Sequence, residues 1–304
     1  MLKKEDIAGW FQNLQDNICA ALQQEDGKGT FREDAWERPG GGGGRSRVIE
    51  NGSIIEKGGV NFSAVHGTLP KQISTALELD DPGFYATGVS IVIHPYNPMM
   101  PIIHMNVRYF ETSSPGKNGE STWWFGGGID LTPHYIVPAD ATFFHRELKK
   151  VCDLHHPGYY ERFKKWADDY FYITHRQETR GIGGIFFDRL GAAEGSKEDL
   201  FEFVKNVGSA FAPIYCHFMK KNGHLSFDEH QKEWQMIRRS RYVEFNLVWD
   251  KGTKFGLQTH GRIESILMSM PPQAHWHYDH QPAANTAEAE TLSFLKKGIN
   301  WLEV

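Results

Sequence analysis

Apolar residues in the first part of the chain recur at the three- and four-residue spacing of an amphipathic helix. This spacing predicts a core-packing helix over residues 4–24, which Gly27 and Gly29 are expected to end. The apolar positions are Ile7, Trp10, Phe11, Leu14, Ile18 and Leu22.

The segment FREDAWERPGGGGGRSR, residues 31–47, follows this helix and contains five consecutive glycines. Arg38, Arg45 and Arg47 flank the glycine run Gly40–Gly44. Because glycine is the most permissive residue in backbone conformation, we expect a flexible loop that becomes ordered when a ligand binds.

From Val48 to Leu131 the pattern changes to alternating apolar and polar residues, which is typical of strands with one buried face. Pro, Gly and Asn separate the runs, and no helical pattern lies between them, so neighbouring strands should pair antiparallel. The predicted strands are 48–52, 58–67, 87–95, 102–110 and 121–131.

The second half of the chain combines both patterns. Helical spacing over 139–180 precedes a predicted strand at 180–188, and Ser196 with Asp199 and Ser226 with Glu229 resemble capping boxes. Further strands are predicted at 241–250 and 265–272, and a short helix at 288–301. Together these elements predict one α+β domain over residues 1–304, with a large, mainly antiparallel β-sheet flanked by helices on both faces.

The strand at 102–110 has an unusual polar face. Its apolar residues alternate with His104, Asn106 and Arg108, whereas a solvated face normally carries Lys, Glu and Thr. We interpret this face as a candidate site, and an exposed face with incidental polar groups is the alternative. Other side chains that could share it are Ser90, His94, Asp130, Asn246 and Asp250.

Arg108 is the most informative of these residues. A guanidinium matches a carboxylate in a two-pronged contact, so Arg108 could bind an acidic ligand or an internal Asp or Glu. Lys254 and Arg262 are further candidate anion contacts, although each could be an ordinary solvated charge.

The chain contains 15 histidines, which raises the question of a metal site. No HEXXH motif is present, and His175 falls on an apolar stripe of the predicted helix, where a hydrogen-bonded core histidine is the commoner case. His275, His277 and His280 could form a local cluster or a solvated edge.

Composition limits the function classes. With 304 residues, 40% hydrophobic residues and a net charge of −5, the chain should bury a substantial core and lack the basic surface of a nucleic-acid-binding protein. No apolar run is long enough to span a membrane, and three scattered cysteines favour a reducing compartment, so we expect a cytoplasmic protein. The glycine-rich segments match no standard nucleotide-binding loop.

Eight segments resemble the oxygen-dependent coproporphyrinogen III oxidase family, and they extend from the first helix to the C-terminus. They are FREDAWERPGGGGGRSRV, GVNFSAVHG, GVSIVIHPYNP, HMNVRYF, WWFGGGIDLTP, DDYFYITHRQETRGIGGIFFD, RYVEFNLVWDKGTKFGLQT and GRIESILMSMPP. The resemblance implies oxidative decarboxylation of two propionates of coproporphyrinogen III to vinyl groups, giving protoporphyrinogen IX in heme synthesis. It also implies O2 as cosubstrate, no organic cofactor, and a homodimer built on a flat antiparallel sheet.

Carried onto this chain, the family pattern makes His104 the proton donor and Asp130 the acceptor of pyrrole N–H groups. Arg108 would then clamp a propionate. The implied substrate contacts are Ser90, Asn106, Val107, Arg108, His260, Gly261 and Arg262, with Asp250 a weaker candidate. Bacterial relatives use positions matching His94, His104, His145 and His175 for a divalent metal, and other relatives need none.

The sequence departs from the family at several polar positions. Relatives tend to have Arg and Glu where this chain has His275 and His277, glycine where it has His260, and Arg where it has Lys251. Two other function classes remain open: a metal-dependent oxidase that uses the histidines as ligands, and a tetrapyrrole carrier without catalysis.

Overall fold

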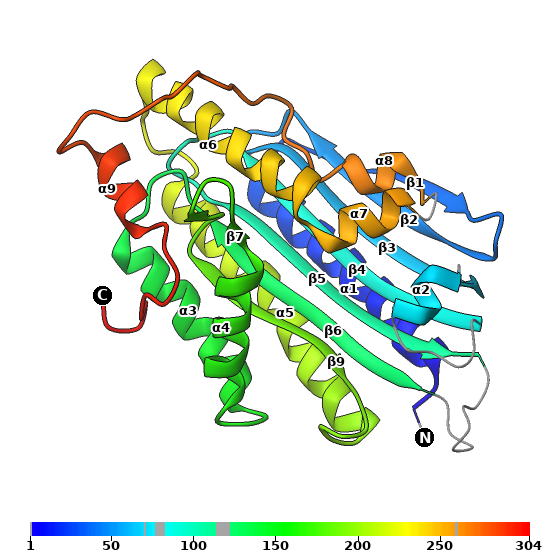
Figure 1. Ribbon diagram of the computed structural model, residues 1–304. Coiled ribbons are helices and arrows are strands. Elements are labelled where there is room, and N and C mark those ends of the chain that lie inside the picture. Colours follow the sequence, from blue (N-terminus) through cyan, green and yellow to red (C-terminus); the bar gives the residue numbers. More distant parts are fainter. Residues whose placement is uncertain (1, 70, 77–82, 114–121, 259–260) are drawn as a thin grey trace.

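A seven-stranded antiparallel sheet forms the centre of the computed structural model, which describes residues 2–69, 71–76, 83–113, 122–258 and 261–304 (Figure 1). Strands β1 to β6 follow one another in sequence order, and β9 pairs with β6 at the far edge. The strands are β1 Arg32–Glu37, β2 Gly42–Glu50, β3 Ile55–Thr68, β4 Gly83–Pro95, β5 Ile102–Thr112, β6 Trp123–Thr132 and β9 Gly183–Leu190. The predicted antiparallel sheet is therefore confirmed.

The glycine run forms a hairpin, so the expectation of a loop that only a ligand would order is wrong. Residues Gly42 to Gly44 belong to β2 and lie between β1 and β3. Gly41 and Gly42 have φ angles of +113° and +78°, which favour glycine and let the chain reverse after β1. Without side chains these residues show no alternation, and the sequence pattern therefore concealed the strand.

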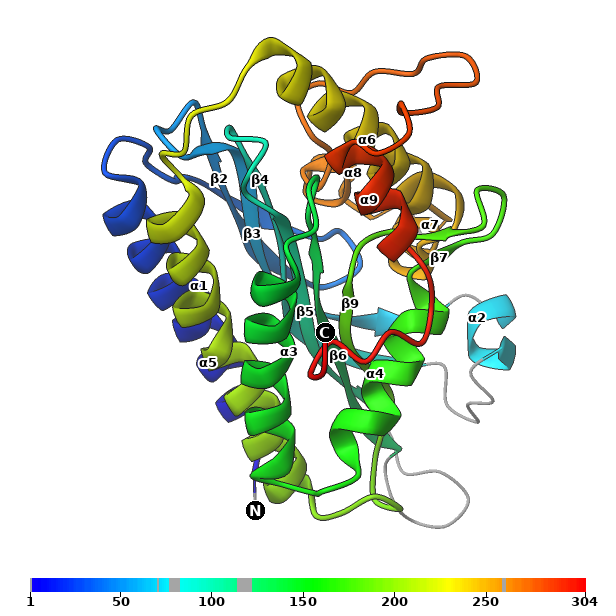
Figure 2. The ribbon, with the colours of Figure 1, turned by 90° about the vertical axis from the view of Figure 1, so that its left-hand side faces the viewer.

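Three helices cover one face of the sheet: α1 (Lys4–Asp26), α3 (Pro138–Asp153) and α5 (Lys197–Asn222) (Figure 2). Helix α4 (Tyr159–Tyr170) packs along β9. The apolar residues of β5 lie in this core, where Met105 and Val107 are 0% exposed. Helix α1 confirms the N-terminal prediction, and Gly27 caps its end with a φ of +72°.

The opposite face is covered by α6 (Glu229–Val248), α7 (Lys251–Gln258) and α8 (Ile263–Leu267) (Figures 1 and 2). The strands predicted at 241–250 and 265–272 are therefore wrong. In α6 the buried residues Tyr242, Phe245 and Asn246 follow helical spacing, while the alternate positions Leu247 and Trp249 are 47% and 38% exposed. The side chains are buried at helical spacing, although the sequence of this segment fits the alternating pattern of a strand equally well.

Shorter elements complete the chain. A hairpin of β7 (Tyr172–Ile173) and β8 (Glu178–Thr179) replaces the last part of the helix predicted over 139–180. Helices α2 (Lys71–Ala76) and α9 (Ala287–Phe294) are also present, so the helix predicted over 288–301 ends early.

The two predicted capping boxes have different outcomes. The Ser196 hydroxyl accepts the backbone N–H of Asp199 at 3.1 Å, as predicted for the start of α5. The N-cap of α6 is instead Asp228, two residues after the predicted Ser226, and it forms a capping box with Gln231. Within the described residues, no helix combines the length and apolar character required to cross a bilayer.

Candidate active site

Polar side chains from neighbouring strands share the sheet face that α6, α7 and α8 cover. In the antiparallel register Ser90 of β4 lies opposite Asn106 of β5, and His104 of β5 lies opposite Asp130 of β6. Arg108, two residues after Asn106, lies on the same face because strand side chains alternate. We call this set, Ser90, His104, Asn106, Arg108 and Asp130, the polar face.

His104, Asp130 and Arg180 form a continuous chain of hydrogen bonds. The Nδ1 atom of His104 lies 2.7 Å from Oδ1 of Asp130. The Arg180 guanidinium donates to both oxygens of the same carboxylate at 2.8 Å. Asp130 and Arg180 are each 1% exposed, whereas the His104 side chain is 21% exposed. Of these three hydrogen-bonded residues, only His104 is therefore accessible to a ligand.

Arg180 is enclosed by three aromatic rings and one amide. Its guanidinium carbon lies 4.4 Å from the ring centre of Phe171, 4.7 Å from that of Tyr242 and 4.6 Å from that of Phe245. It also donates to Oδ1 of Asn246 at 3.0 Å. Cation–π contacts strengthen when they are shielded from water, so this enclosure fixes the guanidinium over Asp130.

The sequence prediction did not include Arg180. The residue lies just after β8, within the segment DDYFYITHRQETRGIGGIFFD, and its partner Asp130 is 50 residues earlier. The sequence feature that could have indicated Arg180 is its position directly before a glycine-rich strand.

The charges of this pair shift the pKa of each member. Burial raises the pKa of Asp130. The adjacent Arg180 and the hydrogen bond from His104 lower this pKa by a larger amount, so it lies below its ordinary value. Burial lowers the pKa of Arg180, and Asp130 more than offsets this effect. Asp130 is therefore ionised at neutral pH. Its carboxylate is 1% exposed and is already hydrogen-bonded to Arg180 and His104.

Arg108 has an internal partner on β9. Its guanidinium donates to Oδ1 of Asn106 at 2.6 Å and to Oδ1 of Asp188 at 2.8 Å. The side chains of Arg108 and Asp188 are 36% and 35% exposed. The ion pair expected as one alternative is present, and it is accessible to a ligand carboxylate.

Gly126 of β6 makes room for this pair. A Cβ atom at Gly126 would lie 2.5 Å from Oδ1 of Asp188 and 2.9 Å from the guanidinium carbon of Arg108. The two side chains therefore lie directly on the β6 backbone, which any larger residue would prevent.

Asn246 and Asp250 reach the site from the covering helices, contrary to the predicted strand. Asn246 is buried in α6 beside Arg180. Asp250 accepts the Tyr170 hydroxyl at 2.8 Å and the backbone N–H of Thr253 at 2.6 Å, at the start of α7. These two residues help to hold the cover in place.

Several other predicted contacts lie elsewhere. The Val107 side chain is 0% exposed in the core on the opposite face of the sheet, so a contact of Val107 with substrate would have to use its backbone. Arg262, which precedes α8, pairs with Asp34 of β1. Gly261 bonds to the Gly256 carbonyl at 2.8 Å, and His260 lies outside the described residues.

The two lysines named from the sequence, Lys251 and Lys254, both lie in α7. The Lys254 ammonium donates to the Val248 carbonyl at 3.2 Å. The backbone N–H of Lys251 donates to the Tyr170 hydroxyl at 3.2 Å, and its side chain is exposed.

The four histidines proposed as metal ligands do not converge. His94 is fully buried against the Ser269 carbonyl, and His145 lies in the core between the Tyr160 hydroxyl and the Ile182 carbonyl. Burial lowers the pKa of His145 to about 3. His175 is in the β7–β8 turn, where it contacts Glu244 and Trp249. Together with His104 these residues do not form a ligand set around one ion in the described part of the chain.

Two comparisons with known proteins bear on this arrangement. The sequence profile described as coproporphyrinogen III oxidase matches residues 6–301. The chain is also 48% identical over 300 residues to a Glycine max protein named oxygen-dependent coproporphyrinogen-III oxidase, chloroplastic, covering 96% of this chain and 77% of that protein. The matched range contains His104, Asp130 and Arg180.

Proposed function

The chain belongs to the coproporphyrinogen III oxidase family, and we propose that its polar face binds the substrate of the family's reaction. That reaction is the oxygen-dependent oxidative decarboxylation of two propionates of coproporphyrinogen III, which gives the two vinyl groups of protoporphyrinogen IX in heme synthesis. Each step transfers the equivalent of a hydride from the propionate to O2. With one proton this yields hydrogen peroxide, and carbon dioxide leaves.

The hydrogen-bonded chain of His104, Asp130 and Arg180 is the observation that carries this proposal. Asp130 is ionised and accepts only, so Nδ1 of His104 holds a hydrogen and Nε2 is the atom left to exchange a proton with substrate. We assign His104 the proton transfer of each step. Asp130 acts through His104 by fixing its tautomer and ring orientation.

Arg108 is the proposed propionate clamp. Its guanidinium is partly exposed, and it is held by Asn106 and Asp188 on the same face as His104. A propionate can replace one of these two hydrogen-bond partners of Arg108, because a guanidinium can donate two parallel hydrogen bonds to a carboxylate. Ser90, opposite Asn106 in the register, supplies a further hydroxyl beside them.

With O2 as the oxidant, the reaction requires few chemical groups from the protein. The reduced macrocycle is electron-rich, so the side chains position it, bind its carboxylates and move protons. The four histidines His94, His104, His145 and His175 do not fit one metal ion as they lie here, and no step is assigned to a metal.

The organisation of the enzyme in the cell stays a prediction. We propose a homodimer without nucleic-acid or membrane partners, located in the cytoplasm. Cys19, Cys152 and Cys216 are free thiols, which fits a reducing compartment. The Glycine max relative is named chloroplastic, so fractionation of cells that express the chain is the direct measurement.

Turnover of coproporphyrinogen III with and without O2, after chelator treatment and without added metal, tests the proposal. We expect protoporphyrinogen IX and carbon dioxide in air and neither product without O2. Binding without carbon dioxide release would indicate a carrier instead. Turnover that returns only when a divalent metal is added would favour a metal-dependent oxidase.

A further inference from the structure

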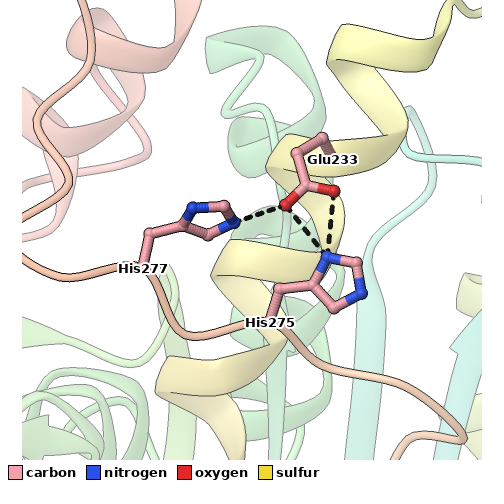
Figure 3. A group of neighbouring side chains, drawn as sticks. All are labelled: Glu233, His275 and His277. Atoms are coloured by element: carbon pink, nitrogen blue, oxygen red, sulfur yellow. Dashed lines mark hydrogen bonds and ion pairs between the residues drawn. The ribbon is translucent and has the colours of Figure 1, made fainter.

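A second group of polar side chains lies on the outer side of α6, formed by Glu233, His275 and His277 (Figure 3). The Nδ1 atom of His275 lies 2.9 Å from both carboxylate oxygens of Glu233. The Nε2 atom of His277 lies 2.8 Å from Oε1 of the same carboxylate. Within the described chain, this is the one group of at least three such ligands whose atoms all lie within 4.8 Å of one another.

The backbone fixes this convergence. Residues 271–286, without helix or strand, run along α6 between α8 and α9, and the backbone N–H of His275 donates to the Met236 carbonyl at 3.0 Å (Figure 1). Trp276 points elsewhere, and its indole N–H donates to Glu244 at 3.0 Å. His275 and His277 are separated by one residue, and both present a ring nitrogen to Glu233.

We propose that Glu233, His275 and His277 bind a divalent first-row transition metal, with Zn²⁺ as the reference ion. Two imidazole nitrogens and a carboxylate oxygen are a donor set that these metals prefer over Mg²⁺ or Ca²⁺. The three side chains are 40%, 47% and 50% exposed, so water can complete the coordination.

Metal binding requires the three ligand atoms, which all lie within 4.8 Å of one another, to reach a common spacing. Tetrahedral zinc ligands lie roughly 3.3 Å apart, because each sits about 2.0–2.2 Å from the ion. The present separations of 2.8 and 2.9 Å must therefore widen by a few tenths of an ångström. Half-exposed side chains can move this far without disturbing the core.

The bound ion would fasten the 271–286 segment to α6. The same helix holds Asn246 against Arg180 at its other end. The expected effect is a gain in thermal stability, since an ion that binds only the folded chain raises its melting temperature. The site is separate from the polar face and takes no part in the proposed reaction.

Zinc titration of the chelator-treated full chain tests the proposal, with calorimetry and thermal unfolding as readouts. We expect one Zn²⁺ per chain and a higher melting temperature. In His275→Gln and His277→Gln the amide can still donate to Glu233 but is a poor metal ligand, so each variant should weaken binding at least 10-fold. His156→Gln, which changes an exposed histidine elsewhere, should bind like the unmodified chain.

Electron paramagnetic resonance with Cu²⁺ identifies the ligands independently of stability. The unmodified chain should show two coordinated imidazole nitrogens and each single variant one. No stoichiometric binding, or equal affinity and equal nitrogen counts in all four proteins, would overturn the proposal and leave a hydrogen-bonded Glu–His group.

Discussion

Arg180 donates to both carboxylate oxygens of Asp130 at 2.8 Å, and each residue is 1% exposed. A buried ion pair is costly to form but far more costly to break, because the remaining charge is left without a partner. The pair also holds the carboxylate in place beneath His104.

Replacement of Arg180 alone should therefore destabilise the fold. We expect Arg180→Met to lower the free energy of unfolding by about 3–5 kcal/mol in urea titrations, because Asp130 keeps its charge without a partner. The double variant Asp130→Asn with Arg180→Met should recover part of this loss. A single variant within 1 kcal/mol of the original chain would contradict the importance of the pair.

The proton-transfer role of His104 predicts a loss in kcat. His104→Asn should lower kcat about 10²- to 10⁴-fold, because the exchangeable Nε2 is lost, with KM little changed. Steady-state turnover of coproporphyrinogen III measures both constants. His224→Gln, which changes an exposed histidine in the connection between α5 and α6, is the control. A kcat within threefold for His104→Asn would reject the role.

The clamp role of Arg108 predicts a change in KM instead. Charge-assisted hydrogen bonds contribute about 1.5–3 kcal/mol, so Arg108→Gln should raise KM about 10- to 100-fold. Asp188→Asn removes the internal partner and should leave KM unchanged or lower it. If both variants raised KM equally, the pair would be structural and the clamp wrong.

Gly126 offers a steric test of the same contact. In Gly126→Ala the new Cβ would crowd Asp188 and Arg108, which must move off the β6 backbone. We expect a KM roughly 3- to 10-fold higher and less than about 1 kcal/mol lost in urea unfolding, since flexible side-chain ends can shift. Gly9→Ala adds the same methyl on α1, where nothing lies within 4 Å. That control should keep KM and gain about 0.5–1 kcal/mol.

Asp26 should make stability depend on acid pH. Burial raises its pKa, but four backbone N–H groups, from Ile55, Gly29, Ser53 and Ile54, lower it to below the ordinary 3.8. A depressed pKa stabilises the folded chain above about pH 4, and this contribution is lost as pH falls further through the folded-state value.

Asp26→Asn should cost about 1.5–3 kcal/mol at pH 7 and flatten the acid limb of a stability–pH curve. Urea unfolding between pH 7 and pH 3 measures this. Asp153→Asn, at an exposed position on α3, should change little. Parallel curves for Asp26→Asn and the original chain would contradict the prediction.

Much of the sheet could be predicted because strands that pair in it mostly follow one another in the sequence, and each strand buries one face. Val107 in the core and Arg108 on the polar face show how strictly alternation sorts such residues. Alternation failed at 241–250, where Tyr242 and Phe245 obey a helical period that the sequence also permits.

The site was only partly predictable for a related reason. His104, Asn106 and Arg108 belong to one strand, so a single pattern identifies them. Arg180 precedes β9 and meets Asp130 only because β9 pairs with β6, a contact that requires the topology. Asp188 reaches Arg108 across the same pairing.

The outer strand β1 leaves one edge of the sheet without a neighbour in the described chain. Its exposed residues include Arg32, Glu33 and Glu37, and charged side chains on an edge strand oppose the addition of a further strand. Two copies of this chain are therefore not expected to join their sheets through β1, and the same charges oppose edge-to-edge aggregation there.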